Sequence, residues 1–157
     1  MEKPETTIVV GYTPTALGRA AVHEAVAEAK RRNASLHVVN TSRGDTYVDH
    51  NMAQPQQLAE LDRWLHGSEV PHHIVQHVGR GEPAEEILRA VDESRAALVV
   101  IGLRRRTPVG KFLLGSTAQR ILLEAPCPVL AVTEGSVDQG RASQGGAVSD
   151  WPAPGPW

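Results

Sequence analysis

Short runs of β-branched and aliphatic residues recur along the chain and are separated by segments with helical periodicity. The runs lack strict apolar–polar alternation, which is typical of strands covered on both faces. They predict strands at residues 6–11, 35–40, 70–78, 96–102 and 128–133. Between them, apolar residues recur at spacings that place them on one face of a helix. This periodicity predicts helices at residues 16–32, 55–66, 84–94 and 116–123.

The alternation of strands and helices predicts an α/β fold. It is typical of an open, doubly wound, Rossmann-like parallel sheet of about five strands with helices on both faces. We expect the very apolar strand 96–102 at the centre of the sheet, beside the first strand. Strand 70–78 contains a proline, which removes a ladder donor, so we expect it at an edge.

Ligands of such sheets bind at the carboxyl ends of the strands, where the strand order reverses. This rule predicts a crevice lined by the segments that follow Gly11, Asn40 and Gly102.

Local signals predict where the helices begin and end. Thr15 is suited to cap the amino end of helix 16–32, and Asn33 to end that helix in the left-handed conformation. Pro83 suits the first turn of the third helix. His23 falls outside the apolar stripe of its helix, so we expect it to be exposed, and Trp64 is expected to pack against the core.

Composition limits the class of protein. A length of 157 residues suits one domain, which we expect at residues 1–134, with a flexible Gly-, Pro- and Ser-rich tail at residues 135–157. The net charge of −2 creates no field that would attract nucleic acid or a membrane surface. With a single cysteine, no apolar leader and no run near the roughly 20 apolar residues that span a bilayer, the chain is expected to be cytoplasmic.

The most informative segment is GLRRRTPVGKFLLGST at residues 102–117. Gly115 and Ser116 stand at a predicted helix start, where unpaired amides and the helix dipole attract phosphate. Three arginines and Lys111 add positive charge nearby. The alternative is that Ser116 and Gln119 form an ordinary S-x-x-Q capping box without a ligand. The arginines and the position at the strand reversal favour an anion modestly over that alternative.

The run VVIGLRRRTPVGKFLLGSTAQRILLEAPCPVLAV resembles the carboxyl-terminal half of universal stress proteins. The ATP-binding branch of that family carries Gly, two residues, Gly, nine residues, Gly, then Ser or Thr. Gly102, Gly115 and Ser116 match this pattern, and Arg105 occupies the position of the second glycine. The stretches IVVGYTPTALGRAAVHEA and LHVVN also fit, so the resemblance covers residues 6–133.

The resemblance implies an adenine nucleotide alpha hydrolase-like fold and a regulatory module that binds ATP, with Mg²⁺, in the stress response. Thr13 stands where family members often carry an Asp, and Thr lacks the carboxylate that grips a ribose or adenine edge. Arg105 is bulkier than glycine, and it would either fill part of the phosphate space or pair with phosphate. The contacts that the resemblance implies are Tyr12, Thr13, Val39, Gly102, Arg105, Gly115, Ser116 and Thr117.

The family also usually forms homodimers, and the resemblance implies pairing of the last strand, PVLAVT at residues 128–133, with its copy. Two other functions stay open. One is a dimeric interaction protein that binds no nucleotide, with its site closed by Arg105 and Thr13. The other is a slow ATP hydrolase, although no water-activating carboxylate is evident in the crevice segments.

No catalytic or metal motif emerges from the remaining residues. His73 and His77 share a strand face, but no carboxylate or cysteine completes a recognisable ligand set beside them, so we interpret them as solvent-facing histidines of an edge strand. Cys127 lies between prolines at the start of a buried strand and is expected to be an inert hydrophobe. The sequence therefore predicts a binding protein with no catalytic residues.

Overall fold

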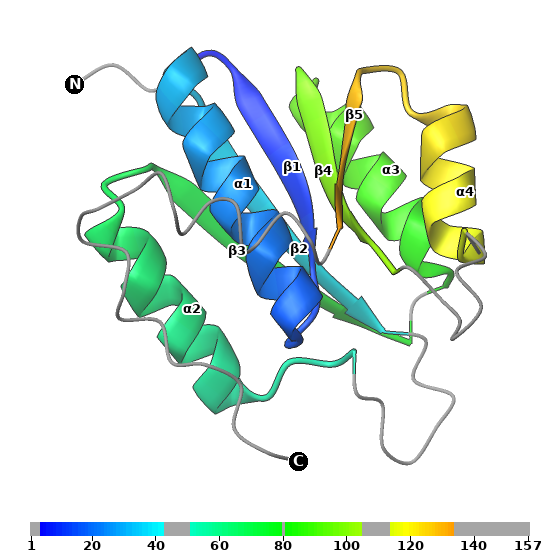
Figure 1. The fold of residues 1–157 in the computed structure, drawn as a ribbon, viewed down its shortest axis with the longest axis horizontal. Coiled ribbons are helices and arrows are strands. Elements are labelled where there is room, and N and C mark those ends of the chain that lie inside the picture. The colour runs from blue at the N-terminus through cyan, green and yellow to red at the C-terminus, as the bar shows by residue number, and fades with distance from the viewer. Residues whose placement is uncertain (1–3, 43–50, 80, 105–113, 134–157) are drawn as a thin grey trace.

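The computed structural model describes residues 4–42, 51–79, 81–104 and 114–133. These residues form a parallel sheet with helices on both sides (Figure 1). The strands are β1 (Thr7–Tyr12), β2 (Ser35–Ser42), β3 (His72–Val78), β4 (Leu98–Leu103) and β5 (Val129–Thr133). The helices are α1 (Ala16–Arg32), α2 (Pro55–Gly67), α3 (Pro83–Ser94) and α4 (Ser116–Glu124). The predicted 135–157 tail lies outside the described residues.

The five-stranded sheet has the order β3-β2-β1-β4-β5, with every pair parallel. The chain moves outward from β1 to β3, then crosses back to β4 on the other side of β1, so the order reverses between β1 and β4. The doubly wound architecture is therefore confirmed, as are the place of β4 beside β1 and of β3 at an edge. The expectation that β4 is the central strand is wrong, because β1 holds that position and β5 alone lies beyond β4. Figure 1 shows all the arrowheads at one end of the sheet, where α1 and α4 begin.

Each face of the sheet has its own apolar layer, because neighbouring residues of a strand point to opposite faces. Ile8 and Val10 of β1 belong to the cluster under α1 and α2, whereas Val9 belongs to the cluster under α3 and α4. All three side chains are fully buried. Burial on both faces explains why the strands show continuous apolar runs.

The ends of α1 follow the predicted local chemistry. The hydroxyl of Thr15 accepts a hydrogen bond from the amide of Gly18 at 3.1 Å. At the other end, Asn33 has φ 49°, and its amide donates to the carbonyls of Ala29 and Lys30. Among the described residues, no helix has both the length and the apolar character that a bilayer crossing requires.

One expectation about the helix surface is wrong. His23 is half-buried rather than exposed, and its ring centroid lies 4.5 Å from that of Trp64. The reason is that α2 packs beside α1, so a position outside the sheet-facing stripe of α1 meets a second helix instead of water. Trp64 packs against the core, as predicted.

Gly102 is required by packing. A Cβ atom at this position would lie 2.7 Å from Cγ of Leu17, in the first turn of α1, and that leucine is buried. Gly67, the last residue of α2, offers a contrast, because a Cβ there would meet nothing within 4 Å.

We expect Gly102→Ala to lower the free energy of unfolding by about 1–3 kcal/mol, since the added methyl group must displace Leu17 or the strand. Urea unfolding followed by circular dichroism measures this change. The matched control, Gly67→Ala, should be neutral or slightly stabilising. Equal stability of the two variants would contradict the close approach of α1 to β4 at Gly102.

Candidate functional site

The candidate site lies at the carboxyl end of the sheet, where β1 and β4 separate to join helices on opposite faces. Val10 of β1 pairs with Val100 of β4, so Tyr12 and Gly102 stand level with each other at the strand ends. The first turn of α4 lies at the same end (Figure 1). The elements that the sequence predicted to meet are thus brought to one edge of the sheet.

The turn after β1 is held tightly against α1. The hydroxyl of Thr13 lies 2.9 Å from that of Thr15, and the carbonyl of Thr13 accepts a hydrogen bond from the Thr15 amide at 2.8 Å. A Cβ at Gly18 would lie 1.8 Å from this carbonyl oxygen, so only glycine fits there. The Thr13 hydroxyl is therefore engaged by the Thr15 hydroxyl that caps α1, and the turn presents a rigid main chain to the crevice.

Asn40 of β2 connects the strand ends. Its side chain is fully buried, and its Nδ2 donates to the carbonyls of Tyr12 at 2.9 Å and Asn51 at 2.8 Å. Its Oδ1 accepts from the Ala53 amide at 3.0 Å and from Nε2 of Gln76 at 2.9 Å. Sequence reasoning used Asn40 only to mark the end of a strand. A polar residue that closes an apolar strand was the available signal for this network.

Arg19, in the first turns of α1, carries a partly buried charge. Its Nη2 is buried and makes no hydrogen bond within the described residues. Burial lowers the pKa of Arg19, and the nearby Tyr12 and Glu60 partly oppose that change. Burial raises the pKa of Tyr12, because its side chain lies in the core. The first turns of α1 thus hold a guanidinium with a buried donor that has no partner among the described residues.

Two of the predicted ligand contacts, Val39 and Gly102, offer no exposed side chain to a ligand. Val39 is fully buried in the cluster under α3, and it pairs with Gly11 on one side and Val75 on the other. The space above Gly102 is filled by Leu17. The side chain of Val39 therefore does not project into open space, and Gly102, which has no side chain, lies under Leu17.

The amino end of α4 has no side-chain cap among the described residues. Gly115 is the N-cap residue, and its carbonyl accepts the first helical hydrogen bond from Gln119 at 2.9 Å. The capping-box alternative is wrong, because Ser116 is the first residue of the helix and not its cap. Ser116 is exposed and Thr117 is half-buried. The first amides of α4 are therefore available to an anion.

Gly115 itself is not required by the fold. Its φ of −62° and ψ of 155° suit any residue, and a Cβ there would meet nothing within 4 Å. Arg104 is exposed, whereas Arg105 and Lys111 lie outside the described residues. Within the described residues, neither packing nor backbone geometry explains this glycine.

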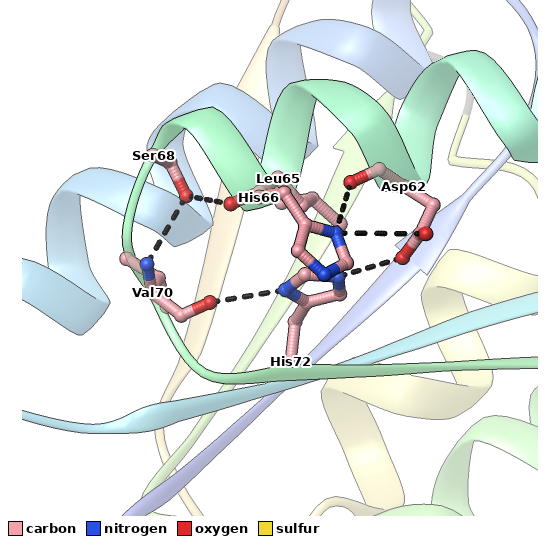
Figure 2. A network of polar contacts seen from close by, with 6 residues as sticks. All are labelled: Asp62, Leu65, His66, Ser68, Val70 and His72. Atoms are coloured by element: carbon pink, nitrogen blue, oxygen red, sulfur yellow. Dashed lines mark hydrogen bonds and ion pairs between the residues drawn. The ribbon is translucent and has the colours of Figure 1, made fainter.

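Outside the crevice, sequence reasoning missed a group of side chains near the start of β3. Asp62, His66 and His72 come within contact distance of one another, shown in Figure 2. The signal was the spacing of Asp62 and His66 by one helical turn, followed after a short connection by a third ligand-type residue. His73 is exposed, as expected, but His77 is half-buried and lies 3.6 Å from the carboxylate of buried Glu86.

Cys127 is half-buried and packs against the cluster under α3 and α4. Burial raises the pKa of its thiol, and the charge of Asp92 adds to that rise. We expect Cys127 in the folded protein to react with a disulfide reagent at pH 8 more slowly than free cysteine, because less of it is thiolate. Release of thionitrobenzoate measures the rate. Protein unfolded in urea is the control and should react as free cysteine does; a fast native rate would contradict this description of the thiol.

The profile of the universal stress protein family matches residues 5–133. A universal stress protein of Mycolicibacterium smegmatis is 51% identical over 125 residues, which are 80% of this chain and 95% of that protein. A universal stress protein structure from Archaeoglobus fulgidus is 26% identical, with a TM-score of 0.60, and covers 83% of this chain and 98% of its own. A universal stress protein in complex with cAMP is 24% identical, with a TM-score of 0.63 and the same coverage.

Proposed function

Because the chain belongs to the universal stress protein family, we propose that it is a cytoplasmic regulatory module that binds an adenine nucleotide, ATP with Mg²⁺ in particular. The nucleotide lies across the carboxyl ends of β1 and β4, with its phosphates at the amino end of α4. The cAMP held by a protein of the same fold supports an adenine nucleotide as the class of ligand. The module acts by binding, and none of its residues is assigned a catalytic role.

The observation that carries this proposal is the uncapped helix start at Gly115. Within the part of the chain that the structure describes, the amides of α4 lack a side-chain cap, and open space lies where a side chain at Gly115 would be. Backbone amides and the helix dipole together favour a phosphate at such a position. Ser116 and Thr117 add hydroxyl donors there, and we propose that Arg105 pairs with the outer phosphates.

The nucleoside end rests on the turn after β1. The hydroxyl of Thr13 is engaged by Thr15, so the main chain of Tyr12 and Thr13 is the surface offered to the sugar. We propose that the main chain of Val39 lies nearest the base. Arg19 brings a positive charge to the same side, and an anion there would satisfy its free donor.

We expect the wild-type chain to bind ATP in a calorimetric titration with Mg²⁺, and Gly115→Val to weaken binding at least about tenfold. The valine side chain would occupy the space that the phosphates need, whereas φ and ψ at this position permit it. Unfolding in urea should be unchanged within about 0.5 kcal/mol, because nothing is displaced. Gly67→Ala is the control and should bind ATP as the wild type does.

Other results of that titration select the remaining functions. No heat at millimolar ATP, AMP or cAMP would exclude the nucleotide and favour a dimeric interaction protein that uses its surface alone. Binding followed by steady phosphate release would identify a slow ATP hydrolase instead. Equal affinity of the wild type and Gly115→Val would contradict the proposed position of the phosphates at the amino end of α4.

We further propose a homodimer through β5. This strand forms an edge of the sheet, and apolar side chains of α4 are exposed on the same side, with Leu123 78% and Leu122 41% exposed. The amide of Val99 donates to the carbonyl of Pro128, and since the polar groups of a strand alternate in direction, those of Val129 and Ala131 point away from β4. A second copy of β5 could pair with them.

We expect Ala131→Pro to convert the dimer to a monomer in size-exclusion chromatography with light scattering. Proline removes an outward-pointing amide, and an edge strand tolerates that loss without breaking its ladder with β4. Charge at Val132 would be a poor test, because its side chain is 2% exposed and belongs to the core. A folded Ala131→Pro variant that remains dimeric would place the interface elsewhere.

A further inference from the structure

A compact group of metal-ligand side chains lies where α2 ends and β3 begins. Asp62 and His66 are one turn apart on α2, and His72 is the first residue of β3. One ligand-type atom from each lies within 4.8 Å of the other two. Figure 2 shows the two imidazole rings beside the carboxylate; they meet edge to face, with their planes at 89° and their centroids 4.8 Å apart. The group joins a helix to the edge strand of the sheet.

His72 has an oxygen acceptor at each ring nitrogen. Its Nδ1 lies 3.0 Å from the carbonyl oxygen of Val70, which can only accept, so Nδ1 carries a proton. Its Nε2 lies 2.8 Å from Oδ1 of Asp62, and a carboxylate also only accepts. A cation shared by Nε2 and the carboxylate would therefore make this contact favourable. The side chain is only 8% exposed, so water can do little to relieve it.

The first nitrogen of His66 is likewise engaged. Its Nδ1 lies 2.9 Å from the carbonyl oxygen of Asp62 and 3.5 Å from Oδ2 of the same residue. Donation from Nδ1 to that carbonyl leaves the lone pair on Nε2. In both histidines, then, a main-chain carbonyl accepts a hydrogen bond from Nδ1, and Nε2 is the nitrogen left for a ligand. This is the arrangement by which proteins orient metal-binding imidazoles.

We propose that Asp62, His66 and His72 bind a divalent transition-metal ion of the Zn²⁺ class, with water in the fourth position. Two imidazoles and a carboxylate form a ligand set that zinc and its neighbours prefer and that Mg²⁺ and Ca²⁺ do not. Zn–N and Zn–O bonds of about 2.0–2.2 Å in tetrahedral geometry separate the ligand atoms by about 3.3 Å. The contact at 2.8 Å between His72 and Asp62 therefore has to lengthen only slightly.

The burial of the ligands suits this role. His72 is fixed in the sheet, whereas the side chains of Asp62 and His66 are 50% and 72% exposed and can adjust to the ion. The ion ties the carboxyl end of α2 to the edge of the sheet. Because His72 begins β3, the ion lies near the amino ends of the strands, at the end of the sheet opposite the nucleotide crevice. It is thus distinct from any Mg²⁺ that accompanies ATP.

The test is a titration of the untagged, chelator-treated chain with ZnCl₂ by calorimetry, and with CoCl₂ by visible absorption. We expect one equivalent to bind, with the d–d bands of tetrahedral Co²⁺. His66→Ala should weaken Zn²⁺ binding at least about tenfold and abolish those bands. The variant is expected to fold, because His66 is mostly exposed. His73→Ala is the matched control, since it removes an exposed histidine next to the site and should leave binding unchanged.

Several outcomes would overturn the proposal. Absence of saturable Zn²⁺ binding would do so, as would equal affinity of the wild type and His66→Ala, or an equal loss in His73→Ala. Octahedral Co²⁺ bands would indicate scattered surface histidines in place of this site. A saturating Zn²⁺ concentration should also raise the melting temperature of the wild type and not of His66→Ala. ATP binding by His66→Ala should match the wild type, so failure of either site is visible separately.

Discussion

The close approach of α1 to the centre of the sheet is the constraint on which the crevice depends. Leu17 fills the space above Gly102 of β4, and the backbone at Gly18 touches the carbonyl of Thr13 after β1. These contacts bind the first turn of α1 to both strands that flank the reversal of strand order. The ends of β1 and β4 therefore keep a fixed separation, and the turn between β1 and α1 has little freedom. A ligand at this edge would meet a surface formed before it arrives, so binding need not include the entropy of ordering a loop there.

Much of the fold could be predicted from the sequence, because its signals are local. Thr15 and Asn33 cap α1 through hydrogen bonds to their near neighbours in the sequence. A strand that is buried on both faces can be identified by its continuous apolar run. The edge position of β3 was predicted from Pro71, which lies just before the strand, and the place of β4 beside β1 from its apolar sequence. Where prediction failed, two elements distant in sequence decided the outcome. His23 is half-buried because α2 lies beside α1, and the apolar periodicity of α1 alone cannot predict that contact.

The predictions about the candidate site also divide into those that rest on local sequence signals and those that depend on contacts between distant elements. Gly102 and Gly115 were both predicted as ligand contacts from one spacing pattern, but the structure distinguishes them, since Leu17 explains the first glycine and nothing in the fold explains the second. The S-x-x-Q sequence was compatible with a capping box, yet the helix begins at Ser116, one residue earlier than that motif needs. Asn40 could not be identified as the link between three strands, because its partners Tyr12, Ala53 and Gln76 come from separate segments. A sequence pattern shows that a glycine is present; only packing shows what the glycine is for.

The polar groups at the two ends of the sheet also differ in what they leave unfinished. At the carboxyl end, Asn40 is fully satisfied by main-chain and side-chain partners, and the groups left with unused capacity are donors: the Nη2 of Arg19 and the first amides of α4. At the amino end of β3, oxygen acceptors outnumber donors around His72, because a carbonyl and a carboxylate face the same ring. Spare donors attract an anion and crowded acceptors attract a cation. The two ends of one small sheet are therefore suited to ligands of opposite charge, and the length of a strand keeps those ligands from competing for the same side chains.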